Sequence, residues 1–372
     1  MKKFKTLLSI MLCVLFLFSM ATVDYIPASA VKSTPTYVAL GDSITTGYGL
    51  ASFIKNDVSN KASVKNYVNK LGKKLGANTV NLGVEGLDST GLLNAIVNPA
   101  TEDQKAAVDK IRTANVITVS IGGNNLLLPL ITAINDKLGK DKTIYNATEQ
   151  DLSAAMTNMF FDDAAMTKLN NALSAATIAF NGESGKAGDF TNIISAVKKL
   201  NPKAQIVVQT VYDPYRFSFT SMFDSIIKSM NDKIIKDSAN GRNYKVADIY
   251  SAFSKAKPGS ALVNADTGKS YDPHPTAEGH QVIYTVVAAA LQNNALPYNV
   301  KASIKNGKLI TKVYAGELIF TVTPGKGYKV PKNITLAIGK GTATALALKN
   351  GSVSVPVADI NTDITVKGTC NK

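Results

Sequence analysis

The sequence predicts an α/β protein that carries a small all-β domain at its C-terminal end. From Tyr37 to Leu291, short apolar runs alternate with segments whose apolar residues recur at helical spacing. This alternation is typical of a parallel sheet covered by helices on both faces. After Pro297 the chain consists of short β-type runs separated by Gly, Asn, Asp and Pro, which predicts a separate β domain over residues 297–372.

Each expected element has its own signal in the chain. Buried strands are expected at residues 37–40, 79–82, 116–121, 206–211 and 244–249, where apolar residues follow one another. Helices are expected at residues 63–75, 101–112, 190–200, 221–235 and 277–291. In the C-terminal part, β-type runs are LITKVY, ELIFTVTP, NITLAIG, SVSVPV and DITVKG.

The alternation breaks in the middle of the α/β part, where residues 126–188 are expected to form a helical insertion. The run LLLPLITAI and the Met156–Phe161 region are apolar and compatible with helical periods. An apolar insertion beside an active site predicts either a lid or a pocket for an acyl chain. The alternative, that the insertion is extra scaffold, stays open at this point.

The N-terminus has the features of a secretory signal peptide over residues 1–30. Lys2, Lys3 and Lys5 precede an apolar run from Leu7 to Met20, and Ala28–Ala30 is a small-x-small cleavage site. The apolar run is short for a membrane span, and nothing after it is apolar for long enough to cross a bilayer. The sequence therefore predicts a secreted or extracellular protein with no transmembrane segment, and a domain of residues 31–296 before the β domain.

The charge and the cysteines restrict the class of protein further. The formal charge is +14, but the lysines are scattered and tryptophan is absent, so nucleic-acid binding is not indicated. A basic secreted protein adheres weakly to anionic wall or membrane surfaces, although a solvated basic surface explains the charge equally well. Cys13 lies in the signal segment, so Cys370 is the only cysteine left and no internal disulfide is expected.

The stretch Tyr37–Gly49, YVALGDSITTGYG, places a serine directly after the first expected strand. Gly41 ends the strand, and Asp42 and Ser43 stand where a helix can begin. At such a turn, the Ser43 hydroxyl lies at the carboxyl edge of the sheet and near the positive end of a helix. Asp and Ser are also ordinary helix N-caps, so this motif alone is a weak signal.

Four stretches fall at the expected carboxyl ends of strands or in the final loop, where an open α/β sheet gathers its ligand. They are Gly41-Asp42-Ser43, NLGVEGLDS (residues 81–89), SIGGNN (residues 120–125) and YDPHPTAEGH (residues 271–280). Together they resemble the blocks of the SGNH hydrolases, also called GDSL-type lipases and esterases. The resemblance extends from Tyr37 to Leu291, and it implies a flavodoxin-like three-layer sandwich with a parallel sheet of about five strands.

The resemblance implies a catalytic serine and histidine. Ser43 matches the family's nucleophile, and His274 matches the base that takes the proton of the serine hydroxyl. His280 is the only other histidine, and we expect it to be structural because a residue in the last helix points away from the serine.

The resemblance also implies three donors for the oxyanion of the tetrahedral intermediate. They are the backbone N–H of Ser43, the backbone N–H of Gly86 and the side-chain amide of Asn124. Gly86 falls in the frame Asn81-x-Gly83-x-x-Gly86, and a glycine lets the backbone approach the oxyanion closely.

Two positions depart from the family's pattern. Asn125 stands where the family usually has Asp, which affects local hydrogen bonding more than catalysis. The family acid usually lies three residues before the histidine, but that position is Tyr271, and Asp272 lies two residues before it. We expect Asp272 to orient His274, and the alternative is a serine–histidine pair held by a backbone carbonyl.

The C-terminal domain also shows a resemblance. Its segment GKGYKVPKNITLAIGKG (residues 325–341) is similar to bacterial surface modules of the divergent internalin-repeat type. The resemblance implies an accessory adhesive or spacer module, with cell-wall or surface contact, and no catalytic residues.

The sequence therefore predicts a secreted serine ester hydrolase that acts on lipid or acylated carbohydrate. A carbohydrate O-acetyl esterase and a non-catalytic surface-binding protein are the alternatives. No cofactor is expected, and two histidines six residues apart without paired cysteines do not predict a metal site. Gly122-Gly123 lacks the Lys-Ser/Thr of a phosphate-binding loop.

Overall fold

The computed structural model describes residues 34–54, 59–144, 146–215, 220–267 and 271–372. The predicted signal peptide, residues 1–30, lies outside the described residues. Residues Pro35–Lys372 form one compact unit. Within the described part of the chain, no helix combines the length and the apolar character that a membrane crossing requires.

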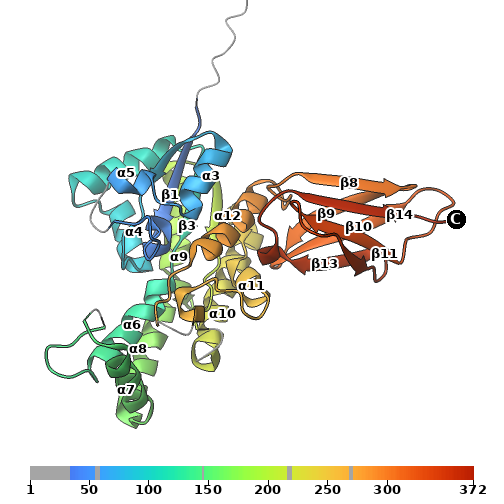
Figure 1. Cartoon of the computed structure of the whole chain (residues 1–372). Coiled ribbons are helices and arrows are strands. Elements are labelled where there is room, and N and C mark those ends of the chain that lie inside the picture. Colours follow the sequence, from blue (N-terminus) through green and yellow to red (C-terminus); the bar gives the residue numbers. More distant parts are fainter. Residues whose placement is uncertain (1–33, 55–58, 145, 216–219, 268–270) are drawn as a thin grey trace, which may run out of the picture. The chain divides into compact units, whose positions relative to one another are not determined.

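The centre of the α/β part is a five-stranded sheet in which every pairing is parallel. Its strands are β1 (Thr36–Gly41), β2 (Asn78–Asn81), β3 (Val116–Ser120), β6 (Gln205–Gln209) and β7 (Lys245–Ala247). They are arranged in the order β2-β1-β3-β6-β7 (Figure 1). Taken in chain order this is the flavodoxin-like order 2-1-3-4-5, whose topological switch point lies between β1 and β3.

Helices cover both faces of this sheet because each strand alternates its side chains between two apolar cores. On one face, Tyr37 and Ala39 of β1 pack with α3 (Tyr67–Leu75) and α12 (Ala277–Leu291). On the other face, Val38 and Leu40 pack with a larger group of helices. That group contains α4 (Ser89–Val97), α5 (Glu102–Thr113), α9 (Asp189–Leu200) and α10 (Thr220–Asp237).

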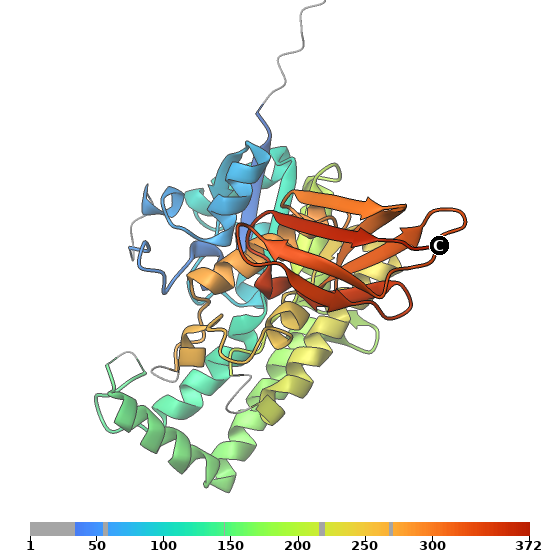
Figure 2. The same ribbon diagram turned by 45° about the vertical axis from the view of Figure 1, so that its right-hand side comes forward.

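The insertion after β3 is helical. It consists of α6 (Gly123–Asn135), α7 (Glu149–Phe160) and α8 (Asp163–Asn181), followed by a two-stranded hairpin of β4 (Gly182–Glu183) and β5 (Lys186–Ala187). In Figures 1 and 2 these helices extend away from the central sheet. Leu126 and Leu130 of α6 and Met159 of α7 are buried in the same core as β3, so the insertion is packed onto the α/β part through its apolar side.

The C-terminal part contains two small β-sheets. One has the order β13-β10-β9, formed by Ser352–Pro356, Glu317–Pro324 and Gly307–Tyr314. The other has the order β12-β11-β14-β8, formed by Thr344–Ala347, Asn333–Ile338, Ile364–Thr369 and Val300–Lys305. Side chains such as Phe320, Leu336 and Val366 from both sheets share one buried core with α12 and with α11 (Ile249–Ser254).

The predicted fold class is confirmed, with a parallel five-stranded sheet, flanking helices and all-β sheets at the C-terminus. The first expected helix begins at Tyr67 rather than Ser63, because the Asn66 side chain accepts the Asn69 N–H and caps the helix there. The boundary between the two expected domains at residues 296 and 297 stays a prediction. The backbone N–H of Val313 donates to the carbonyl of Asn294 across it at 2.7 Å.

Candidate active site

The turn after β1 places Ser43 at the carboxyl edge of the sheet. Gly41 has φ of +150°, and a Cβ atom there would lie 2.2 Å from the carbonyl oxygen of Ser120, so only glycine fits. Asp42 caps the short helix α2 (Ser43–Thr46) by accepting the Ile44 N–H at 3.0 Å. Ser43 is therefore the first residue of α2, two positions after the last residue of β1.

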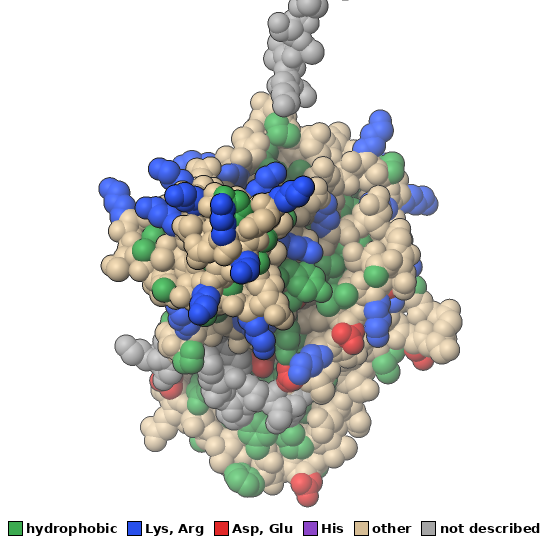
Figure 3. All heavy atoms as spheres, turned by 90° about the vertical axis from the view of Figure 1, so that its right-hand side faces the viewer, with side chains coloured by type: hydrophobic (Ala, Val, Ile, Leu, Met, Phe, Trp, Pro, Cys, Tyr) green, Lys and Arg blue, Asp and Glu red, His purple; other side chains and the backbone are tan. Residues whose placement is uncertain are grey.

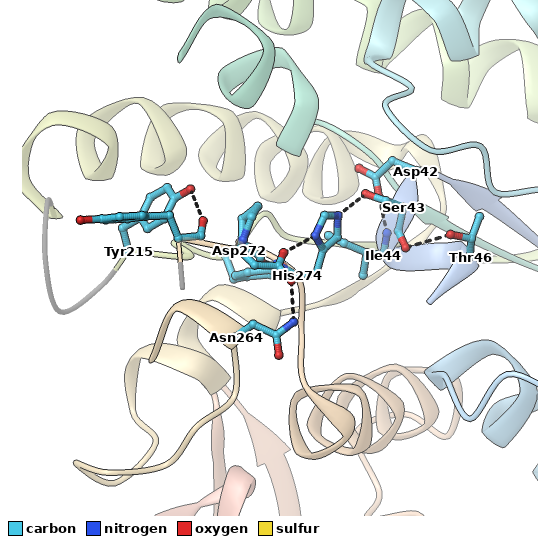
Figure 4. Close-up of polar contacts among 11 residues, drawn as sticks. Asp42, Ser43, Ile44, Thr46, Tyr215, Asn264, Asp272 and His274 are labelled. Carbon is cyan, nitrogen blue, oxygen red and sulfur yellow. Dashed lines mark hydrogen bonds and ion pairs between the residues drawn. The ribbon is translucent and has the colours of Figure 1, made fainter. Parts of the chain in front are cut away.

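The final loop before α12 brings His274 and Asp272 to this serine. The Nε2 atom of His274 lies 2.9 Å from the Oγ of Ser43, and its Nδ1 lies 2.5 Å from Oδ1 of Asp272. Figure 4 shows the three side chains in a row, with Asn264 beyond the carboxylate. The Nδ2 of Asn264 donates to the second carboxylate oxygen of Asp272 at 2.8 Å. The arrangement is a hydroxyl, an imidazole and a carboxylate connected by hydrogen bonds.

Backbone hydrogen bonds hold this loop in register with residues 262–265. The N–H of Asn264 donates to the carbonyl of His274, and the N–H of Ala265 donates to the carbonyl of Asp272, both at 2.9 Å. The N–H of His274 also donates to Oδ1 of Asp272 at 3.0 Å, so the carboxylate is bonded to both the ring and the backbone of the same residue. This tight local turn allows a carboxylate only two positions from the histidine to reach its ring.

Two tyrosines from the segment after β6 support the same loop. The hydroxyl of Tyr212 donates to the carbonyl of Pro273 at 2.7 Å, and that of Tyr215 donates to the carbonyl of Tyr271 at 3.0 Å. The ring of Tyr48 also packs against the ring of His274, with a centroid distance of 4.6 Å. The position of the imidazole is thus fixed by an aromatic contact and by the anchoring of its own loop.

The electrostatics of the site follow from burial and from these bonds. Burial by itself raises the pKa of Asp272, but the hydrogen bond and the charge of His274 outweigh it, so the pKa stays below its ordinary value. Burial raises the pKa of Asp42 to about 7, although the Ile44 N–H and nearby His274 act in the other direction. Of the two acidic groups, Asp272 is therefore the one that is ionised throughout the neutral range.

The other two expected oxyanion donors line the same hollow as Ser43. Gly86 adopts φ of +76°, a left-handed conformation that disfavours a side chain. Asn124 lies in the first turn of α6 and is 5% exposed. Its Nδ2 donates to the carbonyl of Leu87 at 2.9 Å, and because an amide nitrogen carries two N–H groups, this bond orients the amide and leaves a second donor.

Asn125, which departs from the family's pattern, has a structural role next to the site. It accepts the Ser89 N–H at 3.0 Å and donates to the Ser89 Oγ at 2.8 Å. These two bonds fix the first turn of α4 after the loop that contains Gly86. The amide therefore connects the loops that follow β2 and β3.

A cavity of about 470 Å³ opens at Ser43 and His274 and continues over the insertion. Near the serine it is lined by Tyr48, Gly86, Asn124 and Asp272. Farther away its lining is apolar and comes from α6, α7 and the loop between them: Leu127, Leu128, Leu130, Ile131, Ile134, Ile144, Leu152 and Met156. We call this apolar part the acyl trough. A smaller hollow of about 80 Å³ extends from Ser43 toward Phe223 and Ile227 of α10.

The second histidine lies elsewhere. His280 is fully buried in α12, its Nδ1 accepts the Tyr67 N–H at 3.4 Å, and its ring stacks on that of Tyr67. Burial lowers the pKa of His280 to about 3, so the ring is neutral. Among the residues that the structure describes, no three His, Cys, Asp or Glu side chains gather as ligands for a metal ion.

The structure therefore brings Ser43, His274 and Asp272 together, with Gly86 and Asn124 on the same cavity. The sequence reasoning did not find Asn264, Tyr48, Tyr212 or Tyr215 as supporting residues. The segment Tyr212-Asp213-Pro214-Tyr215, which follows an expected strand, is similar to a less diagnostic segment of the SGNH hydrolases, but the sequence assigned no role to its two tyrosines. No motif in the sequence marked Asn264, because its contact with Asp272 forms only when the two loops fold against each other.

Several solved structures are similar to this chain. A phospholipase A1 from Streptomyces albidoflavus is 18% identical, covers 69% of this chain and 100% of its own, and has a TM-score of 0.46. An extracellular lipase from Streptomyces rimosus is 18% identical with the same coverage and a TM-score of 0.43. An acetylxylan esterase from Geobacillus stearothermophilus is 15% identical, covers 70% of this chain and 93% of its own, and has a TM-score of 0.37.

Sequence comparison gives two further matches. The uncharacterised protein YpmR of Bacillus subtilis is 24% identical over 110 residues, which are 29% of this chain and 41% of that protein, so the match spans less than half of that relative. The model of the GDSL-like lipase/acylhydrolase family matches residues 39–282. That match is well over half of the chain and runs from β1 into α12, so this chain belongs to the GDSL-like lipase/acylhydrolase family.

Proposed function

We propose that this protein is a serine ester hydrolase that cleaves carboxylic esters through an acyl-serine intermediate. The observation that carries the proposal is the geometry at His274. One ring nitrogen lies 2.9 Å from the Ser43 hydroxyl, and the other is bonded to the carboxylate of Asp272. A serine hydroxyl is not ionised at neutral pH, so it needs a base within hydrogen-bond distance to act as a nucleophile.

In this mechanism, the Oγ of Ser43 attacks the ester carbonyl carbon while its proton passes to Nε2 of His274. Asp272 accepts the Nδ1–H and stabilises the imidazolium. The oxyanion receives hydrogen bonds from the backbone N–H groups of Ser43 and Gly86 and from the Asn124 amide. The carbon–oxygen bond then breaks and His274 returns the proton to the leaving alcohol. Water attacks the acyl-Ser43 ester by the same route and releases the acid.

The acyl trough supports a substrate with an apolar acyl group. The whole cavity, at about 470 Å³, falls in the range of cavities that bind small molecules, and the trough is the part of it lined by Leu, Ile and Met side chains. Glu85, next to Gly86 in the chain, also lines the cavity. An aliphatic chain placed in the trough would remove apolar surface from water on both sides. We therefore propose fatty-acyl esters, including lipids, as the substrate class.

The proposal includes the location and the C-terminal part of the chain. Secretion is supported by the signal-peptide pattern of residues 1–30, with its lysines, apolar run and small-x-small site. The role of the β-sheets at the C-terminus as an accessory surface module is supported by the resemblance of residues 325–341 to internalin-type repeats.

A series of p-nitrophenyl esters from acetyl to palmitoyl tests the reaction and the substrate class together. We expect hydrolysis that rises from acetyl toward medium or long acyl groups and is lost in Ser43→Ala, whereas Ser89→Ala on α4 keeps it. A preference for acetyl would instead assign the protein to carbohydrate O-acetyl esterases. If a serine-reactive phosphonate failed to label Ser43 in the folded protein, the catalytic proposal would be wrong and a non-catalytic binding protein would remain.

A further inference from the structure

The C-terminal β-sheets carry an excess of positive charge that has no role in the proposed ester hydrolysis. We call residues 297–372, which contain both sheets, the β module. It contains eleven lysines and no arginine, against only three acidic residues, so it carries +8 of the formal +14 of the chain. All eleven lysines are exposed. Figure 3, which looks onto the side of the molecule that carries the module, shows many basic side chains, coloured blue, on that side.

The three carboxylates of the module are all engaged. Glu317 pairs with Lys255 at 3.0 Å, and Asp359 pairs with Lys257 at 2.8 Å, so both interact with lysines of the α/β part. Asp363 accepts hydrogen bonds from the backbone and side chain of Asn299. Within the part of the chain that the structure describes, none of the module's lysines forms an ion pair with a carboxylate. Their positive charge is therefore not neutralised inside the protein.

One strand combines this charge with exposed apolar side chains. On β9, the outward positions are Lys308, Ile310, Lys312 and Tyr314, which we call the β9 strip. They share one face of the sheet because β-strand side chains alternate, and the intervening Val313 is buried. Ile310 and Tyr314 are each 60% exposed. The ammonium group of Lys312 lies 5.0 Å from the centre of the Tyr314 ring.

The lysines of β9 could serve only to protect the edge of the sheet. Strand β9 is one of the two edge strands of its sheet, and lysines on an edge prevent pairing with another chain. That role does not account for Ile310 and Tyr314, which expose apolar surface between the lysines. A side chain such as Ile gains free energy only if something apolar covers it.

From this strip we propose that the β module binds anionic lipid bilayers. Lysine ammonium groups are attracted to anionic headgroups, while their aliphatic stems follow apolar surface. Tyrosine favours the boundary between headgroups and acyl chains, and Ile310 would enter the apolar layer. An anionic polymer in water offers partners for the lysines but none for Ile310, so the bilayer fits the strip better. This inference does not depend on the ester hydrolase activity.

The test uses the full chain without its signal segment and vesicles of phosphatidylcholine, with or without phosphatidylglycerol. In a flotation assay we expect binding to the mixed vesicles, weakened by added salt, and no binding to phosphatidylcholine alone. Lys308→Gln/Lys312→Gln should lower the partition coefficient on the order of 25-fold, since each lysine near an anionic surface contributes about fivefold. Ile310→Ser/Tyr314→Ser should also weaken binding.

The matched control is Lys110→Gln/Lys203→Gln, which removes the same charge from exposed positions of the α/β part. Equal losses in both lysine variants would overturn the proposal in favour of diffuse net charge. It would also be overturned if no vesicle bound the protein while a soluble polyphosphate did, or if Ile310→Ser/Tyr314→Ser abolished self-association instead of lipid binding. All variants should hydrolyse a soluble short-chain ester at the wild-type rate, which separates this test from that of the catalytic proposal.

Discussion

The Nδ1 atom of His274 lies 2.5 Å from Oδ1 of Asp272, although only Pro273 separates the two residues in the chain. The loop is tight enough for this contact because each carbonyl of residues 271–274 accepts a hydrogen bond. The donors are the hydroxyls of Tyr215 and Tyr212 and the backbone N–H groups of residues 264 and 265. Tyr271, three positions before the histidine, contributes its carbonyl to that anchoring. The carboxylate that serves His274 is therefore supplied from a position one residue later than the family's usual one.

We expect Asp272→Asn to lower kcat for a short p-nitrophenyl ester by roughly a hundred- to ten-thousand-fold, because the ring tautomer and the imidazolium both lose their partner. Tyr271→Phe should keep kcat within a few-fold, since its carbonyl remains. The measurement is steady-state kinetics of folded variants. Near-normal turnover by Asp272→Asn would show that a backbone carbonyl or another acid orients His274.

Asn124 and Asn125 are adjacent, and the structure predicts different effects for them. We expect Asn124→Ala to lower kcat about a hundredfold or more, because it removes one proposed oxyanion donor, with little change in Tm. Asn125→Ala should lower Tm, because two bonds to Ser89 are lost, and keep most of kcat. Kinetics and thermal unfolding of both variants check this, and an equal loss of kcat in both would contradict the assignment of Asn124.

Leu152 of α7 lines the acyl trough. We expect Leu152→Trp to shorten the trough and to lower kcat/KM for palmitoyl esters about tenfold or more, since apolar burial contributes about 0.8 kcal/mol per methylene. Hydrolysis of the acetyl ester should be unchanged. Ile178→Trp, on an exposed position of α8 outside the trough, is the control. A parallel fall for acetyl and palmitoyl esters would show that the trough does not hold the acyl chain.

Asp42 should make the protein less stable as the pH rises. Its pKa is about 7 in the folded protein against an ordinary value of 3.8, so its stabilising contribution is present below the lower pKa and is lost as the pH rises through the higher one. Asp42→Asn, which can still cap α2, removes this loss. We expect its unfolding free energy relative to wild type to rise by about 2–4 kcal/mol between about pH 4 and about pH 8. Denaturant titrations at several pH values measure this, and a constant difference would contradict it.

His280 should have the opposite effect. Its pKa is about 3 in the folded protein against 6.5, so the unfolded chain binds more protons and stability is lost as the pH falls from 6.5 toward 3. In wild type the slopes of Asp42 and His280 oppose each other between about pH 4 and pH 6.5. We expect His280→Asn to reveal a fall of unfolding free energy with rising pH across that window. A variant with the same pH profile as wild type would show that folding does not lower the pKa of His280.

Much of the fold was predictable from local pattern. The five strands are apolar runs, and the helices on either side have clear apolar faces, so their existence and order could be read from the sequence. The helix α4 was missed because Ser89–Val97 contains Gly91 and few polar residues, which blur its helical period. Strand β8 was missed although Val300, Ala302 and Ile304 alternate with polar residues, and β12 was missed because it is only four residues long.

The candidate site was predictable where its residues belong to motifs, as for Ser43, Gly86, Asn124 and His274. The sequence could not show that Asn264 holds Asp272, or that Tyr48 packs on the imidazole, because both contacts depend on where loops lie in space. It also could not show the two bonds of Asn125 to Ser89. The catalytic roles of these residues stay predictions for the experiments above.

The helix α6 connects the binding of the acyl chain with the proposed stabilisation of the oxyanion. Asn124 lies in its first turn, and Leu127, Ile131 and Ile134 lie along the next turns of the same helix, on the wall of the trough. A shift of this helix to admit a long acyl chain would move the Asn124 amide with it. Substrate length would therefore affect the turnover of bound ester as well as its affinity, and a fully occupied trough would hold the amide in one place during the reaction.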